Sequence, residues 1–281
     1  MKETLISDNQ QFNETMEKIR SGGMDNLHIL ADFDRTLTKA FYDGEMRPNL
    51  ISVLRKEGYL SEEYVKSAYA LHDHYYPIEI NPNIPIIEKK KEMTDWWNKH
   101  LDLLVKSKLH KSDIEKIIDS GFIEFRPALI EFIRFLNEND IPLVIISANG
   151  LGTDSIRMFF EKNMIMSDNI KIISNGFLWD NDGNAVGYDK RVIHTFNKDE
   201  TVLHDHPEIY EMVKDRKNVI LLGDSTGDPA MIEGFDYDNL LKFGFLNEKE
   251  NEFIGKYKEI YDVVMTGDND GEFLIGLFKD Q

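Results

Sequence analysis

The 281-residue sequence contains no cysteine. A disulfide-stabilised scaffold and a zinc site with cysteine ligands are therefore excluded. The sequence also has no run of about 18 apolar residues that could span a membrane, and the polar segment 1–20 lacks the apolar centre of a signal peptide. We therefore expect a cytoplasmic protein that does not insert into membranes.

Positive charge is scarce. The chain has 33 lysine and arginine residues against 51 aspartate and glutamate residues, and its formal net charge is −18. A surface this acidic repels nucleic acids and anionic membranes, so we expect neither as a partner. It also repels phosphate esters, so an anionic ligand needs a local positive site, such as a metal ion, a lysine or a helix N-terminus. No segment resembles an oligomerisation element, and we expect a monomer.

The order of the expected elements is that of an α/β protein. The apolar segment 27–31 reads as a buried strand that runs into a polar tip at residues 32–34. After Pro127, helices and strands alternate, which favours a doubly wound parallel sheet. Strands are expected at 142–147, 170–173, 218–222 and 261–265, helices at 128–139, 154–162 and 207–216, and a hairpin at 178–186.

Residues from about 44 to 125 show no such strand. Three prolines, Pro77, Pro82 and Pro85, are expected to interrupt this stretch, because proline lacks the N–H that a helix needs. The stretch therefore predicts a helical block inserted into the α/β domain. Its helices are expected at 50–57, 61–75, 88–106 and 111–119.

Polar side chains follow three of the expected strands at the point where each strand ends. In doubly wound sheets, ligands bind beyond the carboxyl ends of the strands. We therefore expect the three tips to converge on one site. They are Asp32-Phe33-Asp34, Ser147-Ala148-Asn149-Gly150, and the segment from Gly223 to Asp228.

The first tip carries two carboxylates. Asp32 and Asp34 point to the same side if the chain stays extended, and charges that close need a shared cation or proton. Mg²⁺, which prefers oxygen ligands, meets that need. With the metal present, Asp32 can attack phosphorus and form an aspartyl-phosphate, while Asp34 can act as general acid and base. Taken alone, the pair is more simply a solvated loop or a pair of helix caps.

The other two tips could complete such a site. Asp224 and Asp228 could fill a metal shell or orient a ligand, and Gly223 permits a tight turn before them. Asp228 could instead cap the next helix. The hydroxyl of Ser147 and the backbone N–H groups after it suit a phosphoryl oxygen, although a serine turn is the simpler explanation of that residue alone.

A phosphohydrolase also needs a cation for the phosphoryl oxygens. Lys190 and Lys198 are the best candidates between the second and third tips, followed by Lys171 and Arg191. Composition does not choose among them, because an average lysine is a solvated surface group.

Together the tips follow the motif order of the haloacid dehalogenase (HAD) superfamily: D-x-D-x-T after a first strand, Ser after a second, then Lys, then G-D-x-x-x-D after a later strand. The chain further resembles the cytosolic 5′-nucleotidase type III family, also called pyrimidine 5′-nucleotidase, over nearly its whole length after residue 25. The segments that carry this resemblance are 32–38, 75–79, 194–198, 219–228 and 241–247.

The resemblance implies a Rossmann-like HAD core formed by residues 1–43 and 127–281, with a helical cap of residues 44–126 that sets substrate specificity. It implies Mg²⁺-dependent hydrolysis of nucleoside 5′-monophosphates through an aspartyl-phosphate at Asp32, with Asp34 as acid and base. Some family members also pass the phosphoryl group to another nucleoside, so phosphotransfer is an open side activity.

The resemblance also implies which residues bind metal and substrate. It favours Lys198 over Lys190 as the phosphate-neutralising cation. It places the Asp32 side chain, the Asp34 backbone carbonyl and Asp224 on Mg²⁺ with Asp228 beside them, Ser147 and Ala148 on the phosphate, and Glu79 on the nucleoside.

The expected cap departs from the family pattern. His100 stands where the family usually offers a serine, after the aromatic pair Trp96-Trp97. Base preference therefore stays open between pyrimidines and 7-methylguanine, a cationic base that some relatives stack on aromatic rings. Trp96 or Trp97 could supply such a ring, and each could equally be cap core. His100 and His194 could be ordinary buried histidines.

Two other functions compete with the nucleotidase. A HAD phosphatase of another small metabolite, such as phosphoserine, would share the core and differ in the cap, through Glu79 and the tryptophans. An inactive binding protein on the same fold is disfavoured, because a degenerate relative is expected to have lost at least one of the core motif residues, and all of them are present.

Overall fold

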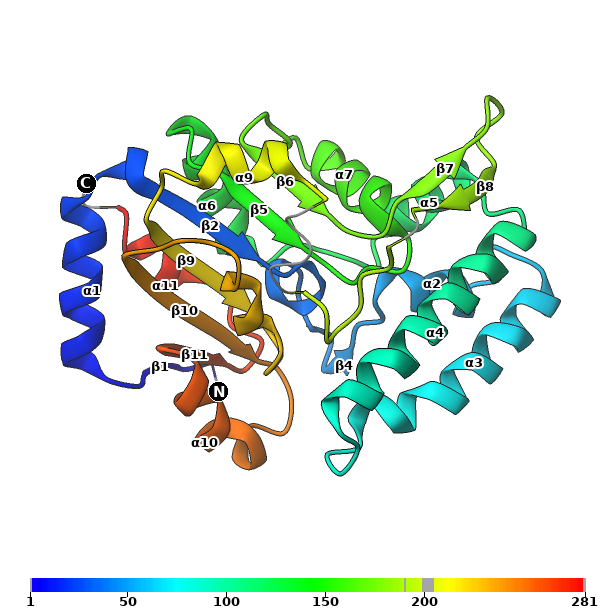
Figure 1. Ribbon diagram of the computed structural model, residues 1–281, viewed down its shortest axis with the longest axis horizontal. Coiled ribbons are helices and arrows are strands. Elements are labelled where there is room, and N and C mark those ends of the chain that lie inside the picture. Colours follow the sequence, from blue (N-terminus) through cyan, green and yellow to red (C-terminus); the bar gives the residue numbers. More distant parts are fainter. Residues whose placement is uncertain (1, 190, 199–204, 280–281) are drawn as a thin grey trace.

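A mostly parallel sheet of seven strands forms the centre of the molecule (Figure 1). The computed structural model describes residues 2–189, 191–198 and 205–279. Neighbouring strands run parallel except β1, which pairs antiparallel with β11. The expected α/β class is confirmed. In sheet order the strands are β1 (Thr4–Ile6), β11 (Val263–Thr266), β10 (Asn239–Leu246), β9 (Asn218–Gly223), β2 (Leu27–Ala31), β5 (Leu143–Ile146) and β6 (Ile170–Ile173).

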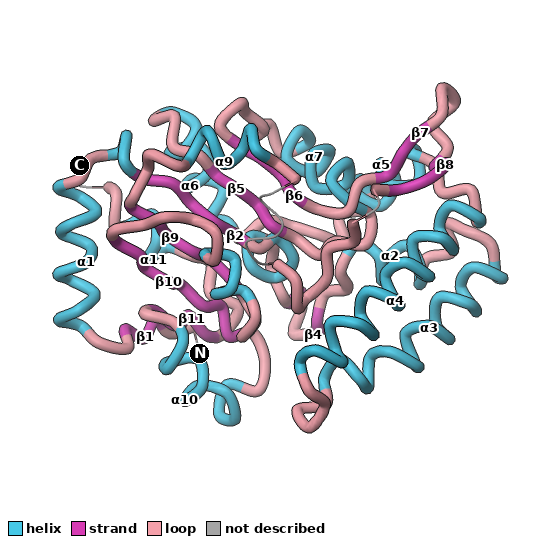
Figure 2. Tube along the Cα trace, in the orientation of Figure 1, coloured by secondary structure: helices cyan, strands magenta, loops and turns pink. Residues whose placement is uncertain are grey.

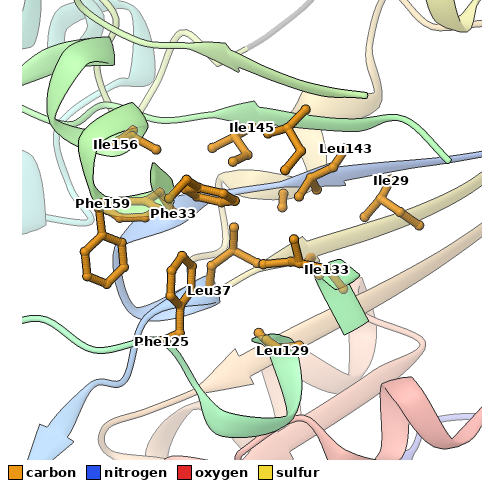
Figure 3. Close-up of a cluster of buried hydrophobic side chains, with 14 of the residues drawn as sticks. Ile29, Phe33, Leu37, Phe125, Leu129, Ile133, Leu143, Ile145, Ile156 and Phe159 are labelled. Carbon is orange, nitrogen blue, oxygen red and sulfur yellow. The ribbon is translucent and has the colours of Figure 1, made fainter. Parts of the chain in front are cut away.

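Alternating side chains of the central strands face two hydrophobic clusters. Ile29 of β2 and Ile145 of β5 belong to one cluster, and Leu30 and Val144 belong to the other. Figure 3 shows the first cluster, in which Phe33 lies just beyond the end of β2. Burial on both faces explains why these strands read as continuous apolar runs.

Helices cover both faces of the sheet (Figure 2). The Asp8 carboxylate caps α1 by accepting hydrogen bonds from Gln10 N and Gln11 N. Among the described residues of this part of the chain, the helices are α1 (Asn9–Ser21), α6 (Pro127–Glu138), α7 (Gly152–Lys162), α9 (Pro207–Val213), α10 (Glu250–Ile260) and α11 (Glu272–Gly276). Short helical turns lie at Met24–Asn26, Phe33–Leu37 and Asp228–Ile232.

The expected helical insertion lies to one side of the sheet and is called the cap below (Figure 1). Its two long helices, α3 and α4, pack side by side and bury Tyr64, Ala68 and Leu101 in the hydrophobic cluster. The cap elements are β4 (Glu45–Met46), α2 (Leu50–Lys56), α3 (Glu62–Ile80), α4 (Ile86–Lys106) and α5 (Lys111–Asp119). The short strand β3 (Phe41–Tyr42), which pairs with β4, lies on the segment that leads into the cap.

Two expectations about single elements were wrong. Helix α3 was expected to end at Tyr75, but it continues through Pro77 to Ile80. Proline costs a helix about 3 kcal/mol, and packing of α3 against α4, which buries Tyr75, outweighs that cost. Strand β10 was not expected as a strand, because Lys242 and Gly244 interrupt its apolar pattern.

The chain enters and leaves the cap through two segments that lie beside each other. Thr38 and Phe125 form an antiparallel bridge, and the N–H of Lys39 donates to the carbonyl of Glu124 at 2.9 Å. On the other side of the cap, the predicted hairpin is confirmed as β7 (Phe177–Trp179) and β8 (Ala185–Tyr188). Its Ala185 N–H donates to the carbonyl of Leu109 at 2.8 Å. The cap is thus held at both ends.

Among the described helices, none combines the length and apolar character needed to cross a bilayer.

Candidate active site

One cavity of about 520 Å³ lies between the carboxyl ends of the central strands and the cap. Because β9, β2 and β5 are neighbours in the sheet, their three polar tips meet there. The residues that the family resemblance pointed to as metal- or substrate-binding line this cavity. These residues are Asp32, Asp34, Glu79, Trp96, Trp97, His100, Ser147, Ala148, Lys198, Asp224 and Asp228.

Asp32 is buried at the end of β2 and is held by two donors. The ammonium of Lys198 donates to its Oδ1, and the hydroxyl of Thr36 donates to its Oδ2 at 3.1 Å. Burial raises the pKa of the Asp32 carboxyl, and the charge of Lys198 opposes that rise. Burial alone would lower the pKa of Lys198, but Asp228 and Asp32 together raise it, so the lysine stays charged.

Lys198 is the candidate cation that the structure places in the cavity. It also donates to Asp228 Oδ1 at 3.1 Å. Lys171 lies on β6 and lines a different depression, and Arg191 pairs with Asp205 at 2.8 Å. Lys190 lies outside the described residues.

Asp228 shapes the loop that follows β9. Its Oδ2 accepts hydrogen bonds from Asp224 N at 3.0 Å and Ser225 N at 2.8 Å, so the alternative role as a helix cap does not account for this carboxylate. Gly223 must be glycine, because a Cβ there would lie 2.5 Å from the Cβ of Asp228. Tyr257, which sequence reasoning missed, secures the loop from α10 by donating to the carbonyl of Asp224 at 2.5 Å.

Three carboxylates meet at this point with more negative charge than Lys198 can balance. Asp32, Asp224 and Asp228 each offer an oxygen within 4.8 Å of the others. Burial, then the charges of Asp32 and Asp228, raise the pKa of Asp224 well above its usual value. A buried group of carboxylate oxygens is the donor set of a hard divalent cation such as Mg²⁺. The residues present therefore fit that ion.

Asp34 has a different environment, and its carboxylate is not one of these three. It follows β2 in an irregular turn in which Arg35 has a φ of 63°. Its Oδ2 accepts a hydrogen bond from Asn149 Nδ2 at 3.2 Å. Burial and then the charge of Asp32 raise the pKa of Asp34 to about 7. A carboxyl group with such a pKa can both give and take a proton near neutral pH.

The tip of β5 carries a serine whose hydroxyl has no partner in the described part of the chain and an asparagine that is held in place. The Oγ of Ser147 is buried and has no hydrogen-bond partner among the described residues. A buried polar group without a partner is costly, and a bound ligand is one explanation for it. The neighbouring Asn149, whose contact with Asp34 the sequence did not reveal, is itself fixed because its Oδ1 accepts from Leu151 N at 2.8 Å.

The cap contributes aromatic rings to the opposite wall. His72 and Tyr76 of α3 stack with centroids 5.0 Å apart, and Trp96 and Trp97 of α4 stack at 6.3 Å. Both tryptophans line the cavity and are half-buried. His72 and Tyr76 were not predicted, although their spacing of four residues on α3, one turn before Glu79, is a signal that could have found them.

Glu79 lies where the cap contacts segment 194–198, which carries Lys198. Its carboxylate accepts a hydrogen bond from the hydroxyl of Thr195 at 2.7 Å. Burial raises the pKa of Glu79, and the bond from Thr195 opposes that rise. Thr94 of α4 is 3.1 Å from Nε2 of His194, which makes His194 a structural contact between cap and core.

His100 is buried beside Trp97, with the two ring centroids 6.0 Å apart. Burial, reinforced by Arg55, lowers the pKa of His100 to about 4, so the ring is neutral at pH 7. Its Nε2 has no hydrogen-bond partner among the described residues.

Comparisons with known proteins identify the family of the chain. The sequence pattern of the family described as Pyrimidine 5'-nucleotidase (UMPH-1) matches residues 35–278. A human protein named 7-methylguanosine phosphate-specific 5'-nucleotidase is 35% identical over 270 residues, which cover 96% of this chain and 89% of that protein. Its namesake from Drosophila melanogaster is 34% identical over 249 residues, covering 88% and 77%.

Solved structures give the same result. The crystal structure of cytosolic 5'-nucleotidase IIIB bound to cytidine matches with a TM-score of 0.88 and 29% identity, covering 98% of this chain and 91% of that one. A phosphoserine phosphohydrolase-like protein from Francisella tularensis, at 17% identity and a TM-score of 0.52, shares the HAD fold alone and covers 88% of this chain and 98% of its own. The family pattern and the relatives span most of the chain, and the protein is a 5′-nucleotidase that belongs to the pyrimidine 5′-nucleotidase (UMPH-1) family.

Proposed function

We propose that this nucleotidase hydrolyses nucleoside 5′-monophosphates to nucleoside and phosphate, with Asp32 as the nucleophile. The observation that carries the proposal is the buried Asp32 carboxylate, which Lys198 holds in a cavity whose opposite wall is aromatic. The wall that carries Asp32 and Lys198 suits a phosphate, and the aromatic wall suits a nucleoside base. The alternative of an inactive binding protein does not explain why these charged groups are assembled at such a desolvation cost.

The reaction proceeds in two displacements. An oxygen of Asp32 attacks phosphorus, and the P–O bond to the 5′-oxygen breaks while Asp34 gives that oxygen a proton. A water then attacks the phosphorus of the aspartyl-phosphate and gives a proton to Asp34, which releases phosphate and restores Asp32. The pKa of about 7 at Asp34 supports both proton transfers.

Mg²⁺ is the proposed cofactor. Asp32, Asp224 and the backbone carbonyl of Asp34 would hold it, with Asp228 beside them. When bound, the ion neutralises charge on the phosphoryl oxygens. Lys198 adds a second positive charge, and the Ser147 hydroxyl with the N–H of Ala148 would receive the remaining phosphoryl oxygens.

The cap is proposed to choose the base. We assign residues 44–126 to a specificity cap and residues 1–43 and 127–281 to the catalytic core. Cavity-lining rings on α3 and α4 offer π faces, and Glu79 offers a carboxylate close to them. That combination suits the cationic base of 7-methylguanosine monophosphate, the phosphate ester named for the curated relatives. Pyrimidine monophosphates are the second substrate class, because the similar solved structure binds cytidine.

The proposal extends to the setting of the enzyme. A Caenorhabditis elegans relative, 33% identical, is named a putative cytosolic 5'-nucleotidase. We place this protein in the cytoplasm as a monomer.

A phosphate-release screen tests the function. The substrates are CMP, UMP, GMP, 7-methylguanosine monophosphate and phosphoserine, each with Mg²⁺, with EDTA and with Mg²⁺ restored. We expect turnover of 7-methylguanosine monophosphate and CMP, loss of activity in EDTA and its recovery with Mg²⁺. Turnover of phosphoserine but of no nucleotide would overturn the substrate assignment. Full activity in EDTA would contradict the assignment of Mg²⁺ as the cofactor.

A further inference from the structure

Among the described residues, Arg126 is the largest fully buried side chain, and the proposed reaction gives it no role. Its guanidinium uses each of its N–H groups and lies 4.3 Å from the centroid of the Phe245 ring. The acceptors are the carbonyls of Thr36 (2.9 Å), Arg35 (2.6 Å) and Asn269 (2.5 Å), Asp268 Oδ1 (2.8 Å) and Asn247 Oδ1 (2.8 Å).

Two of these contacts fix the turn that follows Asp34. The carbonyl of Arg35 accepts from Arg126 and also from Asn247 Nδ2 at 3.1 Å. A left-handed backbone conformation such as that of Arg35 is uncommon for a residue with a side chain. The carbonyl of Thr36 accepts from Arg126, while the hydroxyl of Thr36 donates to Asp32. Arg126 thus reaches Asp32 through one intervening residue.

The remaining contacts join this turn to the connections of the cap. Arg126 stands where the chain returns from the cap, and its own N–H donates to the carbonyl of Leu37 at 3.0 Å. Its partner Asp268 also accepts from the N–H groups of Ala40 (2.8 Å) and Phe41 (3.2 Å), on the outgoing segment. The partly buried ion pair of Arg126 and Asp268 therefore touches both connections and the turn behind the nucleophile.

We propose that Arg126 is a positioning residue for the reaction, which holds the Arg35–Thr36 turn so that Asp32 and Asp34 keep their places and ties that turn to the two cap connections. The proposal rests on Asp32 being the nucleophile. A lysine cannot replace the arginine, because a single ammonium group cannot reach all the acceptors that surround the planar guanidinium group. A merely structural role for Arg126 would lower the stability of the fold without changing the rate of the folded enzyme.

Two variants and one control separate these roles. Arg126→Lys removes the guanidinium group with its five donors. Asn247→Ala removes, from a half-buried position, one acceptor of Arg126 and the second donor to the Arg35 carbonyl. Arg216→Lys is the matched control: Arg216 also binds backbone carbonyls, those of Met24 and Leu27 at 3.0 Å, but at the opposite ends of the strands. kcat and KM are measured per folded molecule, together with thermal unfolding, on p-nitrophenyl phosphate and on the phosphoester that the wild type hydrolyses fastest.

We expect Arg126→Lys to lower kcat on both substrates by roughly 10²-fold, the cost of displacing a reacting group by about 1 Å, with KM nearly unchanged. Asn247→Ala should lower kcat by roughly three- to tenfold, and Arg216→Lys should lower only the unfolding temperature. An unchanged kcat in folded Arg126→Lys would overturn the proposal. If that variant does not fold, an unchanged kcat in Asn247→Ala overturns it. A wild type inactive on nucleotides but active on another phosphoester contradicts the proposed substrate and leaves this comparison intact.

Discussion

The two walls of the cavity are built on different physical principles. On the core wall, charged groups hold one another: Lys198 bridges Asp32 and Asp228, and Asp228 in turn accepts two backbone N–H groups. On the cap wall, ring stacking places Trp96 and Trp97. Fixed charges in a buried site give the electrostatic preorganisation that chemistry needs, whereas ring faces tolerate related bases.

The walls also differ in how they are connected. The core wall is formed by the ends of three adjacent strands. The cap wall contacts segment 194–198, which carries Lys198, through two side-chain pairs: Glu79 with Thr195, and Thr94 with His194. A change in the core should therefore reduce turnover of every phosphoester equally. A change in the cap should alter the preference among them.

The largest effect is expected for Asp32→Asn. An amide cannot form the acyl phosphate, so kcat should fall by roughly 10⁴-fold or more on all substrates. Steady-state kinetics with 7-methylguanosine monophosphate and p-nitrophenyl phosphate checks this, with circular dichroism to show that the fold persists. Substantial activity in a folded variant would remove Asp32 from the role of nucleophile.

Lys198→Met comes next. It removes the charge that holds Asp32 and leaves a side chain of similar length, so kcat should fall by roughly 10²- to 10³-fold on both substrates. Lys171→Met, on β6 and away from the cavity, is the control and should keep near wild-type kinetics. Equal losses in the two variants would show that the loss does not come from the site.

Glu79→Gln probes the cap wall. Loss of the carboxylate charge should lower kcat/KM for 7-methylguanosine monophosphate by roughly tenfold, since a cationic base loses its counter-charge. Turnover of p-nitrophenyl phosphate should be unaffected. Glu88→Gln, an exposed change in the first turn of α4, controls for net charge. A uniform loss on both substrates would place Glu79 with the core wall instead.

The smallest effect is expected from His100 and concerns stability. The ring is neutral in the folded cap, with its pKa lowered to about 4 from 6.5. The unfolded chain therefore binds the proton first as the pH falls. Its contribution to the unfolding free energy is complete above pH 6.5 and is lost as the pH drops from 6.5 toward 4. Between pH 7.5 and 5.5 the loss is about 1 kcal/mol.

His100→Phe removes that titration and keeps the ring. Urea unfolding of wild type and variant at the two pH values measures the difference. The core residue His28, whose pKa burial also lowers to about 4, remains in both proteins, so its contribution cancels. Identical pH dependence in the two proteins would mean that His100 is not buried in the neutral form.

The strands that carry the site could be predicted because each is a short apolar run that ends at a polar residue. Strand β9 is buried along its whole length and stops at Gly223, one residue before Asp224. Adjacency of such strand ends follows from the topology of parallel sheets, so the meeting of Asp32, Ser147 and Asp224 could be predicted without seeing their contacts.

The contacts that tune those residues could not be predicted. Asn149 binds Asp34 across 115 residues of sequence, and Arg126 binds the Arg35 carbonyl across 91. No local pattern encodes such pairs. The path of α3 through Pro77 was missed for a different reason, since local propensity gave way to tertiary packing against the next helix, α4.

The bridge between Thr38 and Phe125 has a consequence for the history of the protein. An insertion whose two ends meet adds little closure entropy to its host, and that entropy grows only slowly with the length inserted. The sheet can therefore accept one cap in place of another while its strand order is preserved. New substrates can arise by exchange of a module, provided that an arginine remains where the module returns to the core and still reaches the carbonyls of Arg35 and Thr36.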